Sequence, residues 1–151
     1  MLIGNCTIGG VKMGAVKRYG DVLIVDDEKN LCETVETYLT EMACFRNILV
    51  ANDGSQAMRK ITNQKFSIIL LDLSMPKKEG IDIIRSIADK KDKQKFNSVG
   101  KIVIMSGTMN EFQLQEAMHL GVRHFLIKPF DKDKFITKIE QIVKSISVED
   151  L

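Results

Sequence analysis

The sequence predicts an α/β protein in which helices cover both faces of a five-stranded parallel sheet, a doubly wound (βα)5 arrangement. Two observations lead to this prediction. From Asp21 onward, short aliphatic runs alternate five times with amphipathic stretches, which is the pattern of repeated strand–helix units. The runs are almost uniformly apolar, as expected for strands that are buried on both faces. The expected strands are residues 22–25, 48–50, 68–71, 102–105 and 125–127.

Amphipathic stretches between the strands predict the helices. Apolar residues that share one helical face occur at positions 31, 35, 38, 39 and 42, and again at 135, 136, 139, 142, 143 and 146. Packing against the core explains both stripes. A further helix is expected to start near Glu79 and to end before the charged residues 89–95, which predict a solvated loop that continues to Gly100.

The length of 151 residues indicates one domain, preceded by an extension of different composition. Residues 1–20 contain five of the ten glycines, and glycine at that density does not favour a helix or a well-packed strand. We therefore expect a glycine-rich extension at 1–20 that need not be ordered, a domain at 21–147 and a short tail at 148–151.

Charge and hydropathy exclude two classes of partner. The 22 basic and 20 acidic residues are scattered, which leaves a formal charge of +2 and no basic patch for a nucleic acid. No apolar run is long enough to span a membrane. The residues before Cys6 provide neither a basic segment nor an adequate apolar stretch for a secretion signal, so we expect a cytoplasmic protein.

Chemically active side chains follow four of the five expected strands. In open parallel sheets, ligands bind outside the carboxyl ends of the strands, so these positions point to a site. In chain order they are Asp26, Asp27 and Glu28, then Asp72, then Ser106 and Gly107, then Lys128 and Pro129.

This set of residues suits phosphoryl transfer to a carboxylate. Asp26, Asp27 and Asp72 would crowd like charges together, and hard oxygen ligands of this kind suit Mg²⁺. Asp72 could then attack phosphorus, while Lys128 takes up charge on the transferred oxygens and Ser106 donates a hydrogen bond to one of them. Taken singly, the paired acids could equally cap a helix, and the serine–glycine pair could be a turn. Their combination at the strand ends favours a site.

The motifs at these strand ends resemble those of the receiver domain of response regulators in bacterial two-component systems, including the single-domain chemotaxis response regulator. They are DDE at 26–28, DLSMP at 72–76 with Gly80, MSG at 105–107 and FLIKPF at 125–130. The resemblance covers residues 21–146. It implies a flavodoxin-like fold with strand order 2-1-3-4-5.

The resemblance also implies a role for each acid. Asp72 would be the phosphoacceptor and Asp27 a direct Mg²⁺ ligand. Asp26 would act on the metal mainly through water, and Ser74 would supply its backbone carbonyl. Together with Asp72 these residues form the expected metal site.

The remaining matched positions are implied to stabilise and report the phosphoryl group. Lys128 would contact the group, and Ser106 would move its hydroxyl toward it. Phe125 occupies the aromatic switch position, where the absence of a tyrosine hydroxyl removes one hydrogen bond that could report the state. The surface that changes would consist of the helix near 111–120, the strand at 125–127 and the helix at 131–146.

The expected function is signalling rather than turnover of a substrate. A histidine kinase or a phosphotransfer protein would donate the phosphoryl group, an unidentified downstream protein would receive the signal, and a phosphorylation-dependent dimer stays open. One alternative is a phosphatase of the haloacid dehalogenase type, which needs a second acid at the position of Ser74. Another is an interaction module that is never phosphorylated, which would be marked by loss of the acids or of Lys128.

Overall fold

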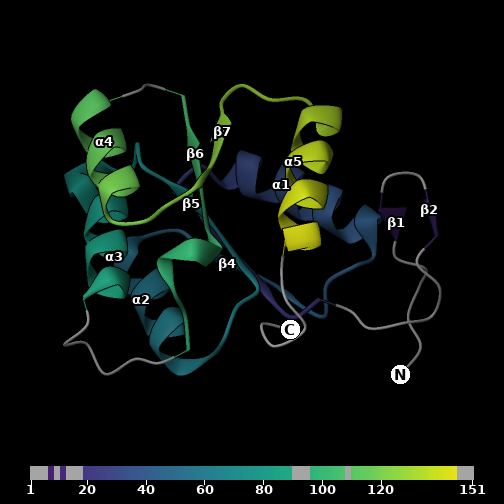
Figure 1. Cartoon of the computed structure of the whole chain (residues 1–151), viewed down its shortest axis with the longest axis horizontal. Helices are drawn as coiled ribbons and strands as arrows, with labels where there is room; N and C mark the ends of the chain where they lie inside the picture. Colours follow the sequence, from purple (N-terminus) through teal and green to yellow (C-terminus); the bar gives the residue numbers. More distant parts are fainter. Residues whose placement is uncertain (1–6, 9–10, 13–18, 90–95, 108–109, 146–151) are drawn as a thin grey trace.

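The computed structural model describes residues 7–8, 11–12, 19–89, 96–107 and 110–145 (Figure 1). The central sheet consists of β3 (Val22–Val25), β4 (Ile48–Ala51), β5 (Ile68–Asp72), β6 (Ile102–Ser106) and β7 (His124–Ile127). The helices are α1 (Lys29–Met42), α2 (Gly54–Asn63), α3 (Glu79–Ala88), α4 (Glu111–His119) and α5 (Lys132–Ser145). Two short 3₁₀ turns, η1 (Pro76–Lys78) and η2 (Val99–Lys101), precede α3 and β6.

The five strands are parallel, and their order in the sheet is β4-β3-β5-β6-β7. Counted along the chain this is 2-1-3-4-5, so the predicted fold class and strand order are confirmed. The register aligns the carboxyl ends: Val25 lies beside Leu71, Asp72 beside Met105, and Ser106 beside Ile127. Residues that follow these strands therefore meet at one edge of the sheet.

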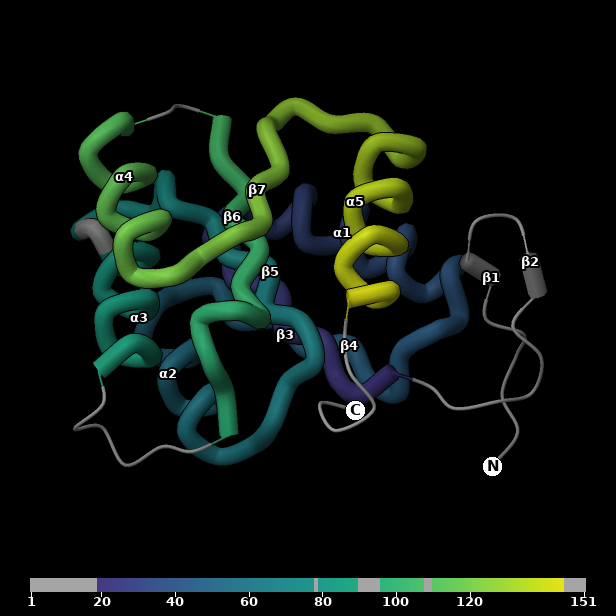
Figure 2. The backbone as a smooth tube through the Cα atoms, in the orientation of Figure 1, coloured from purple at the N-terminus to yellow at the C-terminus, as the bar shows by residue number. Residues whose placement is uncertain are grey.

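Helices cover both faces of the sheet. In Figure 1, α2, α3 and α4 lie on one side, and α1 and α5 lie on the other. The tube in Figure 2 shows how the chain returns across the sheet between successive strands. Side chains of β5 alternate between the layers: Ile68 and Leu70 belong to the core under α1 and α5, whereas Ile69 and Leu71 belong to the other core. Burial of each large apolar side chain contributes about 1.5–3 kcal/mol.

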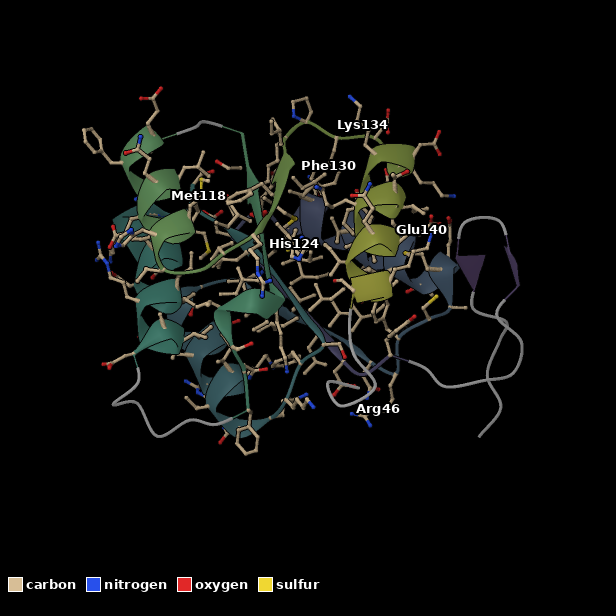
Figure 3. The ribbon with its side chains drawn as sticks, viewed as in Figure 1. Arg46, Met118, His124, Phe130, Lys134 and Glu140 are labelled. Atoms are coloured by element: carbon tan, nitrogen blue, oxygen red, sulfur yellow. The ribbon has the colours of Figure 1, made fainter. Side chains whose placement is uncertain are left out.

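Aromatic packing joins the connection after β7 to the core under α5. Phe135 is fully buried, and its ring centroid lies 5.6 Å from that of Phe130 and 5.6 Å from that of Tyr38 on α1. Figure 3 labels Phe130 between the end of β7 and α5. The segment that carries Lys128 is thereby held against α1 and α5.

Helix α4 is the least buried of the five helices. Ala117 is its one buried residue, while Phe112 is 84% exposed and Met118 is 55% exposed. Asn110 caps the helix by accepting hydrogen bonds from the amides of Phe112 and Gln113. An ion pair between Arg85 of α3 and Glu116, with two N–H···O contacts of 2.6 and 2.8 Å, ties α4 to its neighbour.

The described parts of residues 1–20 are small. Strands β1 (Thr7–Ile8) and β2 (Val11–Lys12) pair with each other in an antiparallel manner. Tyr19 donates its amide to the carbonyl of Cys44 at 2.8 Å, and its ring lies 6.0 Å from that of Phe45, so packing begins two residues before Asp21. The rest of the predicted extension and tail, and most of the predicted loop at 89–95, lies outside the described residues. Within the described ranges, no helix is long and apolar enough to cross a membrane.

Candidate functional site

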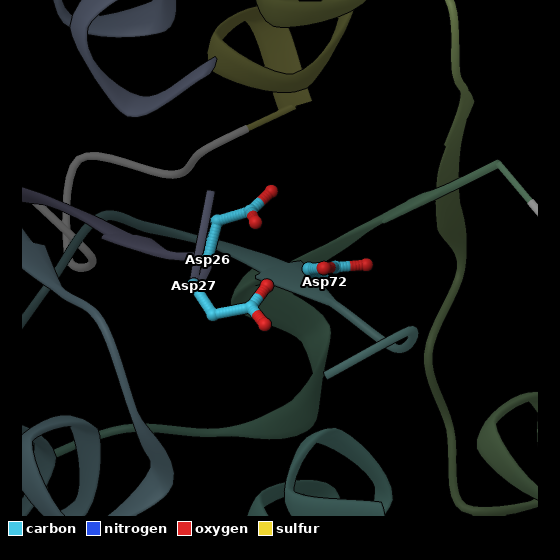
Figure 4. Close-up of side chains that lie close together, drawn as sticks. All are labelled: Asp26, Asp27 and Asp72. Atoms are coloured by element: carbon cyan, nitrogen blue, oxygen red, sulfur yellow. The ribbon is translucent and has the colours of Figure 1, made fainter. Parts of the chain in front are cut away.

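Three carboxylates meet where β3 and β5 end. Asp26 and Asp27 follow β3, and Asp72 is the last residue of the neighbouring strand β5. One ligand oxygen from each lies within 4.8 Å of the others (Figure 4). Asp26 is 0% exposed and Asp72 is 2% exposed, whereas Asp27 faces solvent. Crowding of acids out of water is costly without a compensating cation.

Lys128 supplies one positive charge to this group. Its Nζ donates to Asp26 Oδ2 at 2.8 Å and lies 3.6 Å from Asp72 Oδ2. Its amide donates to the Ser106 carbonyl at 2.8 Å, and a cis peptide joins it to Pro129. Burial alone would lower the pKa of Lys128, but the hydrogen bond to Asp26 and the charges of Asp72 and Asp26 outweigh it and raise the pKa. The side chain is therefore a fixed ammonium.

Asp72 is oriented by the loop that follows it. The amide and the hydroxyl of Ser74 both donate to Asp72 Oδ1 at 2.8 Å, which leaves Oδ2 on the side of Lys128. Burial raises the pKa of Asp72, and the charge of Asp26 adds to the rise, although the bonds from Ser74 oppose it. Ser74 was predicted to contribute only its backbone carbonyl, so these two hydrogen bonds are a new finding. An acid followed two residues later by serine is a common turn pattern that could have indicated these bonds.

Asp26 is held by its own loop and by β4. The amide of Glu28 donates to its Oδ1 at 2.9 Å, and the side chain of Asn52 donates to its carbonyl at 3.0 Å. The thiol of Cys32 reaches the same carbonyl at 3.4 Å. Neither Asn52 nor Cys32 was predicted as a site residue, because nothing in their local sequence marks them.

Ser106 lies on β6, which is next to β5, and Phe125 lies on β7, which is next to β6. Ser106 ends β6, one residue beyond the partner of Asp72, and is 8% exposed. Phe125 on β7 is half-buried and packs against the core under α2, α3 and α4. The structure thus brings Asp26, Asp27, Asp72 and Lys128 into one cluster and places Ser106 and Phe125 on adjoining strands.

Two glycines leave space around the cluster. A Cβ atom on Gly80 would lie 2.6 Å from the backbone oxygen of Asp72, so a side chain there would push α3 away from β5. A Cβ atom on Gly107 would contact Lys128 Cβ at 3.4 Å. Glycine is more strictly required at position 80 than at position 107, because the atom nearest to a Cβ at position 80 belongs to the backbone and cannot change its rotamer.

The donor set fits a divalent metal ion. Three carboxylates face one ammonium, which leaves two negative charges uncompensated, the charge that one Mg²⁺ balances. Carboxylate oxygens are also the ligand type that Mg²⁺ prefers. Among the described residues, this is the group of acids close enough to hold such an ion.

The fold and the acidic cluster agree with the family to which the sequence is similar. Residues 22–140 match the model of the response regulator receiver domain. The chain belongs to this family. Receiver domains act in two-component signalling, in which a histidine kinase is the partner, and the acidic cluster is consistent with a phosphoacceptor site.

Two kinds of curated relative match this receiver domain. The probable chemotaxis protein CheY of Rhizobium etli is 30% identical over 121 residues, which are 80% of this chain and 90% of that protein. The transcriptional regulatory protein CpxR of Escherichia coli is 28% identical over 82% of this chain and 49% of its own length. An uncharacterized transcriptional regulatory protein of Bacillus subtilis, YesN, is 25% identical over 86% of this chain. The chain spans about half of CpxR and 34% of YesN.

Solved structures support the same fold. A signal receiver domain from Bermanella marisrubri superimposes with a TM-score of 0.69 at 32% identity, covering 82% of this chain and 97% of that one. The chemotaxis response regulator CheY4 of Vibrio cholerae gives a TM-score of 0.68 at 21% identity, covering 82% and 98%. The receiver assignment therefore rests on sequence, on strand order and on backbone geometry.

Proposed function

We propose that Asp72 accepts a phosphoryl group from the phosphohistidine of a histidine kinase or a phosphotransfer protein. One observation supports this above all: three carboxylates and the Lys128 ammonium share the edge of the sheet, with oxygens within 4.8 Å. The carboxylate of Asp72 is fixed on one oxygen by Ser74, so the other oxygen is presented toward Lys128.

In the proposed step, Asp72 Oδ2 attacks phosphorus, a P–O bond forms, and the P–N bond to the donor imidazole breaks. The imidazole leaves with the electron pair and takes a proton from water. Lys128 stabilises the negative charge on the transferred oxygens, and Ser106 donates its hydroxyl to one of them. Because the ammonium is already held by Asp26, little reorganisation is needed when the group arrives.

Asp27 and Asp72, with the backbone carbonyl of Ser74, would hold Mg²⁺, and Asp26 would act on it mainly through water. When bound, the ion neutralises charge on the phosphoryl oxygens. Asp26 would also hold the Lys128 ammonium near Asp72, a role supported by the 2.8 Å hydrogen bond between Lys128 Nζ and Asp26 Oδ2.

The proposed response is a change of the face formed by α4, β7 and α5. A phosphoryl group that draws in the Ser106 hydroxyl would vacate space into which Phe125 turns from its half-buried position. Exposed apolar side chains on this face, Phe112, Met118 and Ile127, are available to a downstream protein or to a second copy of the chain. A coupling free energy of about 1–3 kcal/mol between the phosphoryl group and this face is enough to change the ratio of the two conformations by one or two orders of magnitude. The relay would take place in the cytoplasm.

Labelling with acetyl phosphate tests the acceptor. Wild-type protein with Mg²⁺ should gain one phosphoryl group by mass spectrometry, and Asp72→Asn should gain none while keeping its circular dichroism spectrum. Label at wild-type level on the variant would remove Asp72 as the acceptor. No label on the wild type, with or without Mg²⁺, would favour an interaction module that is never phosphorylated.

Beryllofluoride, a phosphoryl mimic, tests the response. Amide shifts should change on α4, β7 and α5 as well as around Asp72, and Ser106→Ala should suppress the distant changes while the mimic still binds. A response confined to the loops around Asp72, or one that Ser106→Ala leaves undiminished, would refute the proposed switch.

A further inference from the structure

A cavity of about 240 Å³ lies at the opposite edge of the sheet from Asp26 and Asp72. Its lining residues come from the starts of neighbouring strands: Ser67 precedes β5, Lys101 precedes β6, Arg123 precedes β7, and His124 is the first residue of β7. The last turn of α5 closes it with Ser145. Since a strand of five residues is about 15 Å long, this amino-edge cavity is separate from the carboxylate cluster.

The charge of the amino-edge cavity is positive. Lys101 and Arg123 contribute two permanent cations, and no acid is among its described lining residues. Arg123 is exposed and takes part in none of the salt bridges of the described chain. The carbonyl end of α5 offsets part of this charge, but a helix end counts for about half a charge against two full ones.

Hydrogen-bond donors line the same space. His124 is half-buried at the start of β7, and Figure 3 labels it between β7 and α5. Burial lowers the pKa of His124, and the charges of Lys138 and Arg123 lower it further, so the ring is neutral at neutral pH and donates one N–H. Ser67 and Ser98 add hydroxyl groups.

Gly100 helps to place the guanidinium. A Cβ atom on Gly100 would lie 3.1 Å from Nη2 of Arg123, so the bare backbone of η2 lets the guanidinium lie close to it at the rim of the cavity. A guanidinium at the rim is able to donate two parallel N–H groups to one ligand.

We propose that the amino-edge cavity binds a small phosphate-bearing anion. Its donors come from several strand starts and from the Arg123 guanidinium at the rim, which suits the several acceptor oxygens of a tetrahedral phosphate better than the two coplanar oxygens of a carboxylate. Pockets for drug-sized ligands have volumes of about 300–1,000 Å³, so a cavity of 240 Å³ limits the ligand to inorganic phosphate or a small phosphorylated metabolite. The proposal is independent of phosphorylation at Asp72.

A titration of the full chain with inorganic phosphate tests the site. Two-dimensional ¹⁵N–¹H spectra would be recorded at neutral pH, with EDTA present and ionic strength held constant by sodium chloride. We expect saturable shifts at Gly100, Lys101, Arg123 and His124. Acetate at the same ionic strength should shift these amides far less.

Matched variants separate a site from general charge. Arg123→Gln should weaken phosphate binding by at least about tenfold, the effect of losing a charge-assisted hydrogen bond. Arg59→Gln removes the same charge from an exposed position on α2 that does not line the cavity, and should change the affinity by less than about twofold. Asp72→Asn should leave binding unchanged.

Several results would overturn the proposal. They are shifts that do not saturate, equal losses in Arg123→Gln and Arg59→Gln, acetate binding as tight as phosphate, or shifts centred on Lys128 that Asp72→Asn alters. The last would place the phosphate in the carboxylate cluster and would leave the proposed phosphorylation of Asp72 standing.

Discussion

Lys128 Nζ lies 2.8 Å from Asp26 Oδ2 and 3.6 Å from Asp72 Oδ2, so one ammonium joins the ends of β3, β5 and β7. The lysine reaches across the sheet, because β5 and β6 separate its strand from β3. Its hydrogen bond is with Asp26, which is fully buried, and this makes the pair part of the fold as well as of the site.

Replacement of Lys128 by methionine should destabilise the fold by about 3 kcal/mol, because it leaves Asp26 buried without its cation. The Lys128 side chain is 16% exposed, so the loss should fall toward the lower end of the range for buried pairs. Urea unfolding measures it. The double variant Lys128→Met with Asp26→Asn should recover part of the loss, and equal stabilities for wild type and Lys128→Met would show that the pair adds nothing.

Asp72→Asn should stabilise the metal-free protein at neutral pH. Because burial raises the pKa of Asp72 above its ordinary 3.8, the folded state binds more protons than the unfolded state above that pH. The wild type therefore loses stability as pH rises from 3.8 through the raised pKa of the folded state, and it stays less stable at higher pH. Each ~1 kcal/mol that the substitution adds to the free energy of unfolding should raise Tm by about 2–4 °C.

Two controls sharpen this comparison. The advantage of the variant should vanish below pH 3.8, where the carboxyl is protonated in both states. Added Mg²⁺ should stabilise the wild type more than the variant. A lower Tm for Asp72→Asn than for the wild type, at neutral pH in EDTA, would contradict the expectation that the buried charge of Asp72 destabilises the metal-free protein.

His124 should make stability fall on mild acidification. Its pKa is lowered from 6.5 by burial and by the charges of Lys138 and Arg123, so the unfolded state binds the extra proton as pH falls through 6.5. Stability is present above this pH and is lost below it, down to the pKa of the folded state. His124→Gln should flatten the pH dependence of Tm in this interval, and identical slopes for both proteins would argue against the shift.

Cys32 should resist alkylation in the folded protein. Burial, reinforced by the charge of Asp26, raises its pKa from 9.0 to about 11. The thiolate, which is the reactive form, is then about a hundredfold scarcer at mildly alkaline pH than in an ordinary thiol. Peptide mass spectrometry after iodoacetamide treatment, with and without urea, gives the ratio of rates. Similar rates in both conditions would mean that the start of α1, where Cys32 lies, opens readily.

Removal of residues 1–17 should leave the fold nearly unchanged, because the domain is expected to begin near residue 21 and Tyr19 is retained. Tyr19 binds Cys44 through its amide and packs on Phe45. Thermal melts of the two proteins provide the test. A drop in Tm of more than about 5 °C would mean that the extension packs on the core.

The strands, and the residues that meet at their carboxyl ends, were predictable from the pattern of apolar residues. Uniformly apolar runs gave the strands, and the meeting of Asp26, Asp27 and Asp72 follows from parallel strands whose carboxyl ends share an edge. The strand order came from the resemblance of the motifs. The roles assigned to Ser106 and Phe125 in phosphoryl transfer stay predictions.

Local patterns could not predict which atoms would pair. That Lys128 bonds Asp26 rather than Asp72 depends on side-chain conformation across three strands. The bond from Asn52 to the Asp26 carbonyl joins residues on different strand ends, and only the assembled sheet brings them together. The amino-edge cavity likewise has no motif, because its residues are spread from Ser67 to Ser145.

Helix α4 buries little of its surface against the rest of the domain, and this favours local unfolding of the helix. With Ala117 as its one buried residue, the helix gives up little apolar contact when it opens locally. Its amide hydrogens should therefore exchange with deuterium sooner than those of α1 or α5, each of which buries four side chains. Of the five helices, the one on which the signal is proposed to act is thus also the one that we expect to unfold locally at the lowest cost in free energy.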